Sequence, residues 1–186
     1  MKQAESGSPF EVSALILPMA DVDRAIASYR QRHTSDGAMG VGAHLTLLYP
    51  FCGHGEWNEA GYRRVMMAAA GTPQFTLVFH RLNRFPRDRV IYLEPEPDER
   101  LTSLLHTLVV SFPEHPPYGG EIALEDLRAH VTIAVASDAD EMGRLEAELQ
   151  RELSPLLPLR VEVSSVWMIV RVEGNWRLLS IFPLAS

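Results

Sequence analysis

The sequence predicts an α+β fold with antiparallel or mixed sheets. Segments with the two-residue alternation of β-strands are interspersed with segments whose apolar residues recur every three or four positions, as in helices. Several strand segments follow one another closely enough to form hairpins. No Pro- or Ser-rich linker divides the chain, so we expect a polar, mobile tail over residues 1–9 and a single domain over residues 10–186.

Seven segments have strand character. The alternation of Phe75, Leu77 and Phe79 is typical of a strand with one buried face. The strand segment at residues 90–93 follows it closely enough to be its hairpin partner. A turn at residues 173–175 should join the last two strands in a second hairpin. The predicted strands span residues 10–17, 43–51, 74–82, 90–93, 129–136, 159–172 and 176–182.

Four segments have the apolar spacing of helices. The clearest is a leucine-rich stretch that begins at Pro97 and Asp98 and ends at Pro113. The first helix is expected to begin at Asp21, a residue type that caps helices well. The predicted helices span residues 21–32, 56–70, 98–112 and 138–153, and the loops between them include residues 35–42 and 113–121.

Composition and charge limit the class of protein. Of the 186 residues, 46% are hydrophobic, which is enough for a full core and excludes a disordered chain. Cys52 is the only cysteine, so neither an intramolecular disulfide nor a Cys-based zinc site can form. A net charge of −7 argues against binding of long nucleic-acid duplexes. With no signal-peptide pattern and no apolar stretch long enough for a bilayer, we expect a cytoplasmic, monomeric protein without membrane contact.

One pentapeptide pattern occurs twice, as AHLTL at residues 43–47 and AHVTI at residues 129–133. Both copies lie in predicted strands. Seven His and seven Thr in 186 positions give roughly 0.3 His-x-Thr occurrences by chance, before the matching flanks are required. A strand sends residues i and i+2 to the same face, so each histidine lies beside its threonine while the aliphatic residues enter the core.

This arrangement suits phosphate chemistry. The pairs His44 with Thr46 and His130 with Thr132 each offer a titratable nitrogen and a hydroxyl for a phosphate oxygen. If the pairs flanked one phosphate, one imidazole could deprotonate the attacking oxygen while the other protonated the leaving oxygen, without a metal. The alternative is that each histidine is a half-buried structural residue of its strand. The duplication in matching context favours the catalytic interpretation.

The sequence resembles the 2H phosphoesterase superfamily, in particular its 2′-5′ RNA ligase-like and cyclic-phosphodiesterase members. The similarity extends from AHLTLLYPF at residues 43–51 through residues 89–108 and FPEHPPYGG at residues 112–120 to AHVTIAVA at residues 129–136. It implies a pseudo-symmetric, two-lobed α+β fold in which the two motif strands meet in a central cleft. Ala43 and Ala129 precede the histidines where related sequences often have proline or another strand-entry residue.

The resemblance also implies an activity. His44, Thr46, His130 and Thr132 would be the four signature catalytic residues of an enzyme that opens an RNA-end 2′,3′-cyclic phosphate or a related cyclic nucleotide phosphodiester. His130 would act as the base towards water and His44 as the acid towards the leaving ribose oxygen. The superfamily also includes ligases, so reversible 2′-5′ RNA ligation remains open.

Five further residues are candidates for substrate binding, each with a plain structural alternative. Arg84 and Arg87 could hold additional phosphates or be part of a solvated turn, and Arg128 could contact phosphate or form an outward salt bridge. Tyr118 could stack on a base or pack in its loop, and Tyr49 could line the cleft or pack in the core. The remaining histidines lack the repeated context, and no spacing indicates a metal site or a cofactor.

Three hypotheses therefore remain open. The first is the phosphoesterase, with RNA termini or small cyclic nucleotide phosphates as partners. The second is a non-catalytic binder of phosphorylated RNA ends or nucleotides, and the third is a structural interaction domain. Two titratable imidazoles in matching motifs favour the enzyme, because a binder needs hydroxyls and arginines more than it needs histidines.

Overall fold

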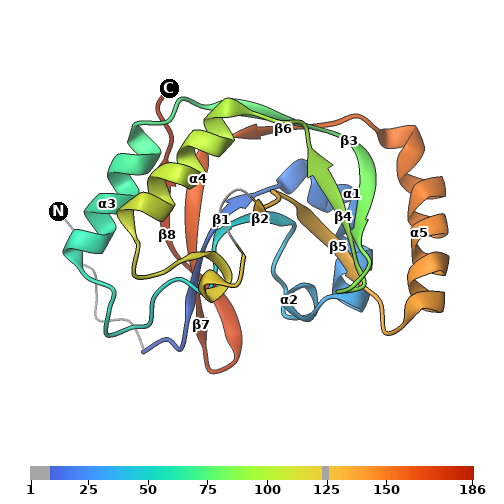
Figure 1. The fold of residues 1–186 in the computed structure, drawn as a ribbon, viewed down its shortest axis with the longest axis horizontal. Helices are drawn as coiled ribbons and strands as arrows, with labels where there is room; N and C mark the ends of the chain where they lie inside the picture. Colours follow the sequence, from blue (N-terminus) through green and yellow to red (C-terminus); the bar gives the residue numbers. More distant parts are fainter. Residues whose placement is uncertain (1–8, 123–125) are drawn as a thin grey trace.

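Two curled four-stranded antiparallel sheets form the centre of the molecule, with strand orders β2-β1-β7-β8 and β5-β4-β3-β6 (Figure 1). The computed structural model describes residues 9–122 and 126–186, so the predicted tail lies outside the described residues except for Pro9. The strands are β1 Ser13–Pro18, β2 His44–Leu48, β3 Phe75–Phe85, β4 Val90–Pro95, β5 Val131–Val135, β6 Leu159–Val163, β7 Ser165–Val172 and β8 Asn175–Pro183. The helices are α1 Ala20–His33, α2 Ser35–Ala38, α3 Glu59–Ala70, α4 Glu99–Ser111 and α5 Ala139–Leu153, with the short 3-10 helices η1 Pro117–Gly120 and η3 Ser154–Leu156.

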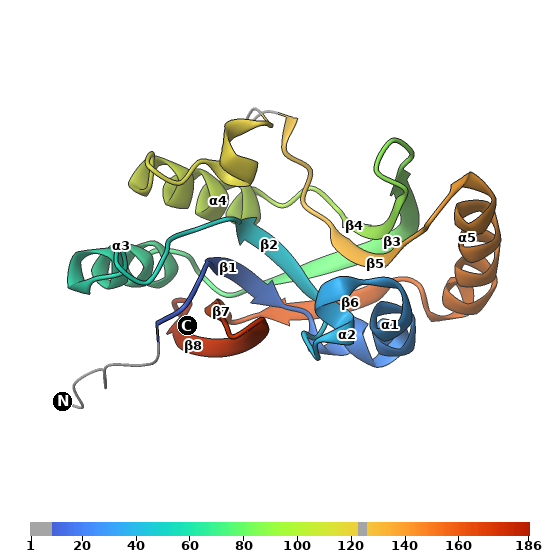
Figure 2. The same cartoon turned by 90° about the horizontal axis from the view of Figure 1, so that it is seen from below.

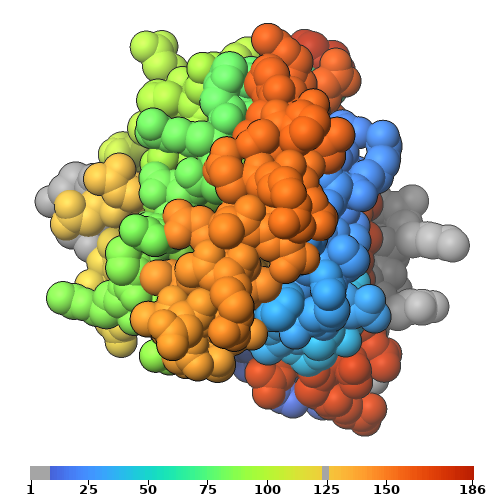
Figure 3. All heavy atoms as spheres, turned by 90° about the vertical axis from the view of Figure 1, so that its right-hand side faces the viewer, coloured from blue at the N-terminus to red at the C-terminus, as the bar shows by residue number. Residues whose placement is uncertain are grey.

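Two helices pack on the sheet to which the preceding strand does not belong. Helix α1 follows β1 of the first sheet but packs against β5 and β6 of the second, whereas α4 follows β4 of the second sheet but packs against β2 of the first. Helix α3 joins α4 on the first sheet (Figures 1 and 2). Figure 3 shows the opposite end, where α5 in orange lies between α1 in blue and the green segment of β3 and β4. Each sheet is thus covered partly by a helix that follows a strand of the other sheet.

Most of the buried apolar residues form one large cluster that includes both motif strands. Leu45 and Leu47 are each 1% exposed, and Val131 and Ile133 are fully buried. The alternation predicted for the motifs is therefore confirmed, and it places their histidines and threonines on the opposite face of each strand. Within the described residues, no helix has both the length and the apolar character needed to cross a bilayer.

Most predicted elements are confirmed, including both hairpins and the cap of the leucine-rich helix. Asp98 accepts hydrogen bonds from the backbone amides of Arg100 and Leu101 at the start of α4. Helix α1, however, begins at Ala20, directly after the strand that ends at Pro18, so Asp21 lies in the first turn instead of at the cap. Its carboxylate there still favours the helix, because the N-terminal end of a helix carries partial positive charge.

Three other boundaries differ from the prediction. Asn58 caps α3, which therefore begins at Glu59 and not at residue 56. The predicted loop at residues 35–42 contains the one-turn helix α2, where the Thr34 hydroxyl accepts a hydrogen bond from the backbone amide of Gly37. Within the predicted loop at residues 113–121, the 3-10 helix η1 forms.

The single strand predicted over residues 159–172 is wrong. It is two strands, β6 and β7, which belong to different sheets. Burial alternates through Val161 and Val163 but resumes one position out of phase at Val166, with the exposed Ser164 between them. A one-residue shift turns every following side chain to the other face of a strand. The shift at Ser164 marks the point where the chain passes from the second sheet to the first.

Candidate active site

The fold brings the two copies of the motif together. His44 opens β2 and His130 immediately precedes β5, and these two edge strands are neighbours in the middle of the molecule (Figure 2). A cavity of about 280 Å³ is lined by both motif histidines and both motif threonines. Its lining also includes Arg30, Asp36 and Tyr118. Segments 86 positions apart in the sequence therefore share one pocket, which we call the motif pocket.

Both imidazoles are oriented in the same way. His44 Nδ1 is 2.9 Å from the carbonyl oxygen of Gly42, and His130 Nδ1 is 2.7 Å from that of Arg128. A carbonyl can only accept a hydrogen bond, so each Nδ1 carries the proton. In the neutral ring, Nε2 is then left as the basic nitrogen. Each motif therefore fixes its histidine through the backbone two residues earlier and leaves Nε2 for chemistry.

Charged groups surround His44. Arg30 of α1 is only 1% exposed, and its guanidinium donates to the Thr132 carbonyl and to Asp36 Oδ2, both at 2.5 Å. The same carboxylate oxygen lies 3.9 Å from His44 Nε2. Burial opposes ionisation of Asp36, yet Arg30 and then His44 lower the pKa of its carboxyl below the usual value. Arg30 thus connects the second motif strand to the carboxylate that faces the first motif histidine.

Aromatic rings surround His130 instead. The rings of Phe85 and Tyr92 meet the imidazole edge to face, with centroids 5.2 and 5.3 Å away. Phe85 and Tyr92 also stack on each other at 4.2 Å. Tyr92 pairs directly with Thr132 across β4 and β5, so this aromatic contact is part of the sheet itself. The His130 ring is therefore held by packing, and none of the carboxylates in residues 9–122 and 126–186 pairs with it as Asp36 does with His44.

Burial lowers the pKa of both motif histidines below the ordinary value of 6.5. Beside His44, the Arg30 charge lowers the pKa further, while Asp36 and the Gly42 carbonyl raise it. The neutral form of both rings therefore predominates at pH 7. Either one can accept a proton from a nucleophile, and a bound phosphate anion would help the other to hold one.

The two candidate tyrosines lie next to each other. Tyr118 lines the motif pocket, and its backbone N–H donates to the Tyr49 carbonyl at 2.8 Å. Burial raises the pKa of the Tyr118 phenol, which keeps it protonated as a hydrogen-bond donor at neutral pH. Tyr49 is 37% exposed and lines an adjoining cavity that shares His44 and Thr46 with the motif pocket.

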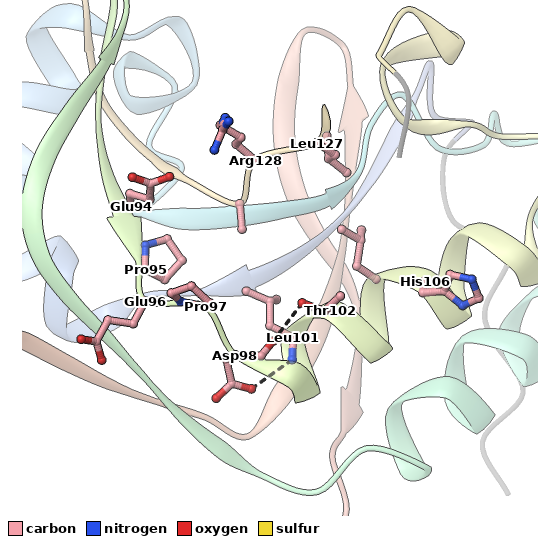
Figure 4. A pocket seen from close by; sticks show the side chains of 12 residues that line it. Glu94, Pro95, Glu96, Pro97, Asp98, Leu101, Thr102, His106, Leu127 and Arg128 are labelled. Atoms are coloured by element: carbon pink, nitrogen blue, oxygen red, sulfur yellow. Dashed lines mark hydrogen bonds between the residues drawn. The ribbon is translucent and has the colours of Figure 1, made fainter. Parts of the chain in front are cut away.

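The three candidate arginines do not line the motif pocket. Arg84 forms an ion pair with Glu146 of α5 at 2.6 Å, and Arg87 is exposed in the turn between β3 and β4. Arg128 lines a larger cavity of about 520 Å³ (Figure 4). Its contribution to the site is the carbonyl that orients His130.

That larger cavity is no candidate for the motif chemistry. It lies at the start of α4, and its lining includes none of the motif histidines and threonines (Figure 4). Two of its carboxylates already have partners, since Asp98 caps α4 and Glu94 accepts a hydrogen bond from Asn83 at 3.0 Å. Over residues 9–122 and 126–186, no three His, Cys, Asp or Glu side chains gather as a metal-binding group.

Sequence reasoning missed Arg30 and Asp36. A signal for Arg30 existed, because it follows Ile26 by four positions and so lies on the stripe of α1 that should be apolar. A charged residue on such a stripe is buried only when it is paired. Asp36 belongs to the predicted loop at residues 35–42 and gave no comparable signal.

A family model described as the 2′-5′ RNA ligase superfamily matches residues 18–175, which includes both motifs. The chain belongs to the 2′-5′ RNA ligase superfamily. The resemblance to 2H phosphoesterases that the motifs predicted is thereby confirmed. Membership of this superfamily of phosphoesterases and RNA ligases supports the prediction of an enzyme. No curated protein matches the chain.

Solved structures with the same fold include E. coli LigT complexed with 3′-AMP, with a TM-score of 0.60 at 16% identity, covering 96% of this chain and 100% of that one. A crystal structure named phosphoesterase has a TM-score of 0.60 at 18% identity, with the same coverage of both chains. The protein TT0787 of Thermus thermophilus has a TM-score of 0.57 at 14% identity, covering 94% of this chain and 98% of that one. These structures confirm the predicted two-lobed α+β fold of the superfamily.

Proposed function

We propose that this protein is a metal-independent phosphoesterase that opens 2′,3′-cyclic phosphates at RNA ends or on nucleotides. The observation that carries the proposal is the pairing of His44 and His130 in one pocket, each with Nδ1 bound to a backbone carbonyl and Nε2 left for chemistry. Two such imidazoles can serve both sides of one phosphorus.

The proposed reaction needs only water and the two histidines. One neutral imidazole takes a proton from water as the water oxygen forms a bond to phosphorus. The bond from phosphorus to one ribose oxygen breaks, and the other histidine, protonated in the bound complex, donates its proton to that oxygen. The product is a phosphomonoester on the ribose. If the 5′-hydroxyl of a second RNA takes the place of water, the same proton transfers form a 2′-5′ phosphodiester, so the proposal includes reversible ligation.

The other residues of the motif pocket bind the phosphate in this proposal. Thr46 and Thr132 donate their hydroxyls to the non-bridging oxygens, since each lies on the face of its strand that carries the histidine. Arg30 offsets part of the negative charge and holds Asp36 to the second motif strand. The Tyr118 phenol can supply a further donor at the wall.

Nucleotide substrates agree with the ligands of a relative. E. coli LigT has been crystallised with 3′-AMP, NADP+ and ATP, all of which carry a nucleoside and phosphate. In this chain the net charge of −7 repels a long polyanion, so recognition should be limited to a terminal nucleotide and its nearest phosphates.

The direct test is turnover of 2′,3′-cyclic AMP by the purified protein in excess chelator, followed by chromatography of the products. We expect conversion to adenosine monophosphate with a bell-shaped pH profile, whose limbs belong to the coupled pair of imidazoles. Activity that is lost on chelation and restored by a divalent ion would contradict the metal-independent mechanism. Binding of the nucleotide without any turnover would favour the non-catalytic binder.

A further inference from the structure

One carboxylate lies in the motif pocket, which is unexpected for a site that binds phosphate. Asp36 Oδ2 lies 3.9 Å from His44 Nε2, the nitrogen left for chemistry. A phosphate oxygen bound to this nitrogen comes close to the carboxylate, and like charges at such short range repel each other. The position of Asp36 therefore limits how much negative charge a ligand of the pocket can carry.

The fold fixes Asp36 in this position. Helix α2 packs directly on α1, and a Cβ on Gly37 would collide with the Arg30 carbonyl, so glycine is needed for this approach (Figure 2). The Asp36 carbonyl accepts a hydrogen bond from the Val41 amide at 3.0 Å, and its Oδ2 accepts one from Arg30 Nη2. The backbone and the side chain are both held, so the carboxylate stays beside His44.

The fixed charges of the motif pocket cancel. Among the described residues of its lining, Arg30 is the only arginine or lysine and Asp36 the only carboxylate. Burial raises the pKa of Asp36, but the Arg30 charge and His44 together lower it below the usual value, so the carboxyl is ionised at neutral pH. With one histidine protonated in the bound complex, the pocket then carries a single net positive charge.

The adjoining cavity does not change this count. It shares Asp36, His44 and Thr46 with the motif pocket, and Arg171 is the only arginine or lysine among the described residues that line it. Arg171 already forms an ion pair with Glu11 at 3.0 Å. Within the described part of the chain, a ligand phosphate therefore meets one uncompensated positive charge, the protonated histidine.

The substrate and the product of the proposed reaction differ in charge. A 2′,3′-cyclic phosphate is a diester with one negative charge, whereas the second proton of a phosphomonoester dissociates with a pKa of about 6, which leaves nearly two charges at pH 7.5. The protonated histidine balances the one charge of the diester. The second charge of the monoester faces Asp36 without a cation from the described lining to balance it.

We propose that Asp36 makes the motif pocket selective for singly charged phosphodiesters over doubly charged phosphomonoesters. This inference rests on the proposed function and adds a specificity-determining residue to it. Asp36 takes no part in proton transfer. Its charge weakens the binding of the phosphomonoester product, so the product leaves and the pocket is free for the next substrate.

Equilibrium binding at pH 7.5 tests the selectivity without requiring turnover. The ligands are 3′-deoxyadenosine 2′-phosphate and its methyl ester, which share base, sugar and phosphorus and differ by one charge. Without a 3′-hydroxyl, the ester cannot close to a cyclic phosphate. We expect the wild-type protein to bind the methyl ester at least as tightly as the monoester, although a pocket with an unpaired arginine would prefer the higher charge. This comparison needs no variant.

Variants of Asp36 assign the selectivity to its charge. Asp36→Asn keeps an acceptor for Arg30 and should bind the monoester about tenfold more tightly, with a change of less than about threefold for the methyl ester. Asp36→Glu keeps the charge and should keep the wild-type ratio of the two affinities. Asp21→Asn is the matched control and should also keep that ratio, because Asp21 forms an exposed ion pair with Arg24 and lines neither cavity.

Turnover of 2′,3′-cyclic AMP separates the two proposals. For Asp36→Asn, we expect the inhibition constant of the monophosphate product to fall about tenfold, while KM for the cyclic substrate changes less than about threefold. The selectivity without any turnover would overturn the proposed function and keep the role of Asp36. Tighter binding of the monoester by the wild-type protein, binding of neither ligand, or the same ratio of affinities in Asp36→Asn as in the wild-type protein would overturn that role.

Discussion

The two copies of the motif have the same sequence pattern and the same backbone contact but different surroundings. In each, the imidazole Nδ1 is bound to the carbonyl of the residue two positions earlier. Around His44 the contacts are ionic, with Asp36 and the buried Arg30, whereas around His130 they are aromatic, with Phe85 and Tyr92. The repeat thus fixes the orientation of both rings, and the rest of the fold makes them different.

This difference shows what a duplicated motif can specify. Orientation depends on residues inside the pentapeptide and just before it, so both copies reproduce it. The surroundings come from other elements: α1 and the segment after it reach His44, while β3 and β4 reach His130. A symmetrical pair of bases is thereby placed in an asymmetrical pocket, as a reaction with a different oxygen on each side requires.

The largest expected effect is on catalysis by the pair itself. His44→Ala and His130→Ala should each lower kcat with 2′,3′-cyclic AMP by about two to four orders of magnitude, because each removes one of the two proton transfers. His106→Ala, on the exposed face of α4, is the control and should keep wild-type activity. Full activity in both motif variants would contradict the two-histidine mechanism.

The ionic surroundings of His44 should matter most for stability. Arg30→Met leaves the Thr132 carbonyl and the Asp36 carboxylate without their partner, so the free energy of unfolding should fall by about 3 kcal/mol. Urea unfolding measures this. Arg32→Met, on the exposed side of the same helix, should change the unfolding free energy by less than about 0.5 kcal/mol. If Arg30→Met were as stable as Arg32→Met, the contacts of Arg30 with Asp36 and with the second motif strand would contribute nothing to stability.

The motif threonines should have a smaller effect than the histidines. Thr46→Val and Thr132→Val keep the shape of the side chain and remove one hydroxyl each, which should cost about tenfold in kcat/KM for one lost hydrogen bond to a charged phosphate. Thr76→Val in β3 has the same chemistry outside the motif pocket and is the matched control. A loss as large as that of the histidine variants would assign the hydroxyls a role in proton transfer.

Both histidines should also make stability depend on pH. Their pKa values are lowered in the folded protein, so the unfolded chain binds more protons below its own pKa of 6.5. This contribution is fully present above about pH 7 and is lost as pH falls through 6.5 towards the lower folded values. The urea midpoint should therefore be lower at pH 5.5 than at pH 7.5. In the double variant with His44→Gln and His130→Gln, the urea midpoint should change less between pH 5.5 and pH 7.5. If it changed as much as in the wild-type protein, the two histidines would not be the cause of the pH dependence.

The smallest expected effect concerns salt. Engagement of two or three phosphates by the motif pocket predicts a log-log slope of affinity against salt of about 2 or less for short single strands, at about 0.7 for each phosphate. Binding of RNA oligonucleotides of two to twelve residues with a 2′,3′-cyclic end measures it. Affinity that rises steadily with length, together with a steeper slope, would contradict recognition of the terminus and would favour a binder of longer RNA.

The sequence by itself determined the class of fold and the four motif residues. Alternation and helical spacing are local properties, so they predicted the strands of both motifs, the leucine-rich helix and the hairpin of β3 and β4. The duplicated pattern identified His44 and His130 because it is visible along the chain without knowledge of contacts.

Only the tertiary structure decided which other side chains join those four. Arg30 and Asp36 reach the motif pocket because α1 crosses to the second sheet, and Trp176 flanks it because the chain changes sheets at Ser164 and returns beside β1. Arg84, which the sequence placed among the candidates, is instead paired with Glu146 of α5. These contacts depend on the order of strands and the crossing of helices, and a local pattern encodes neither, because both result from how distant segments bury their apolar faces together.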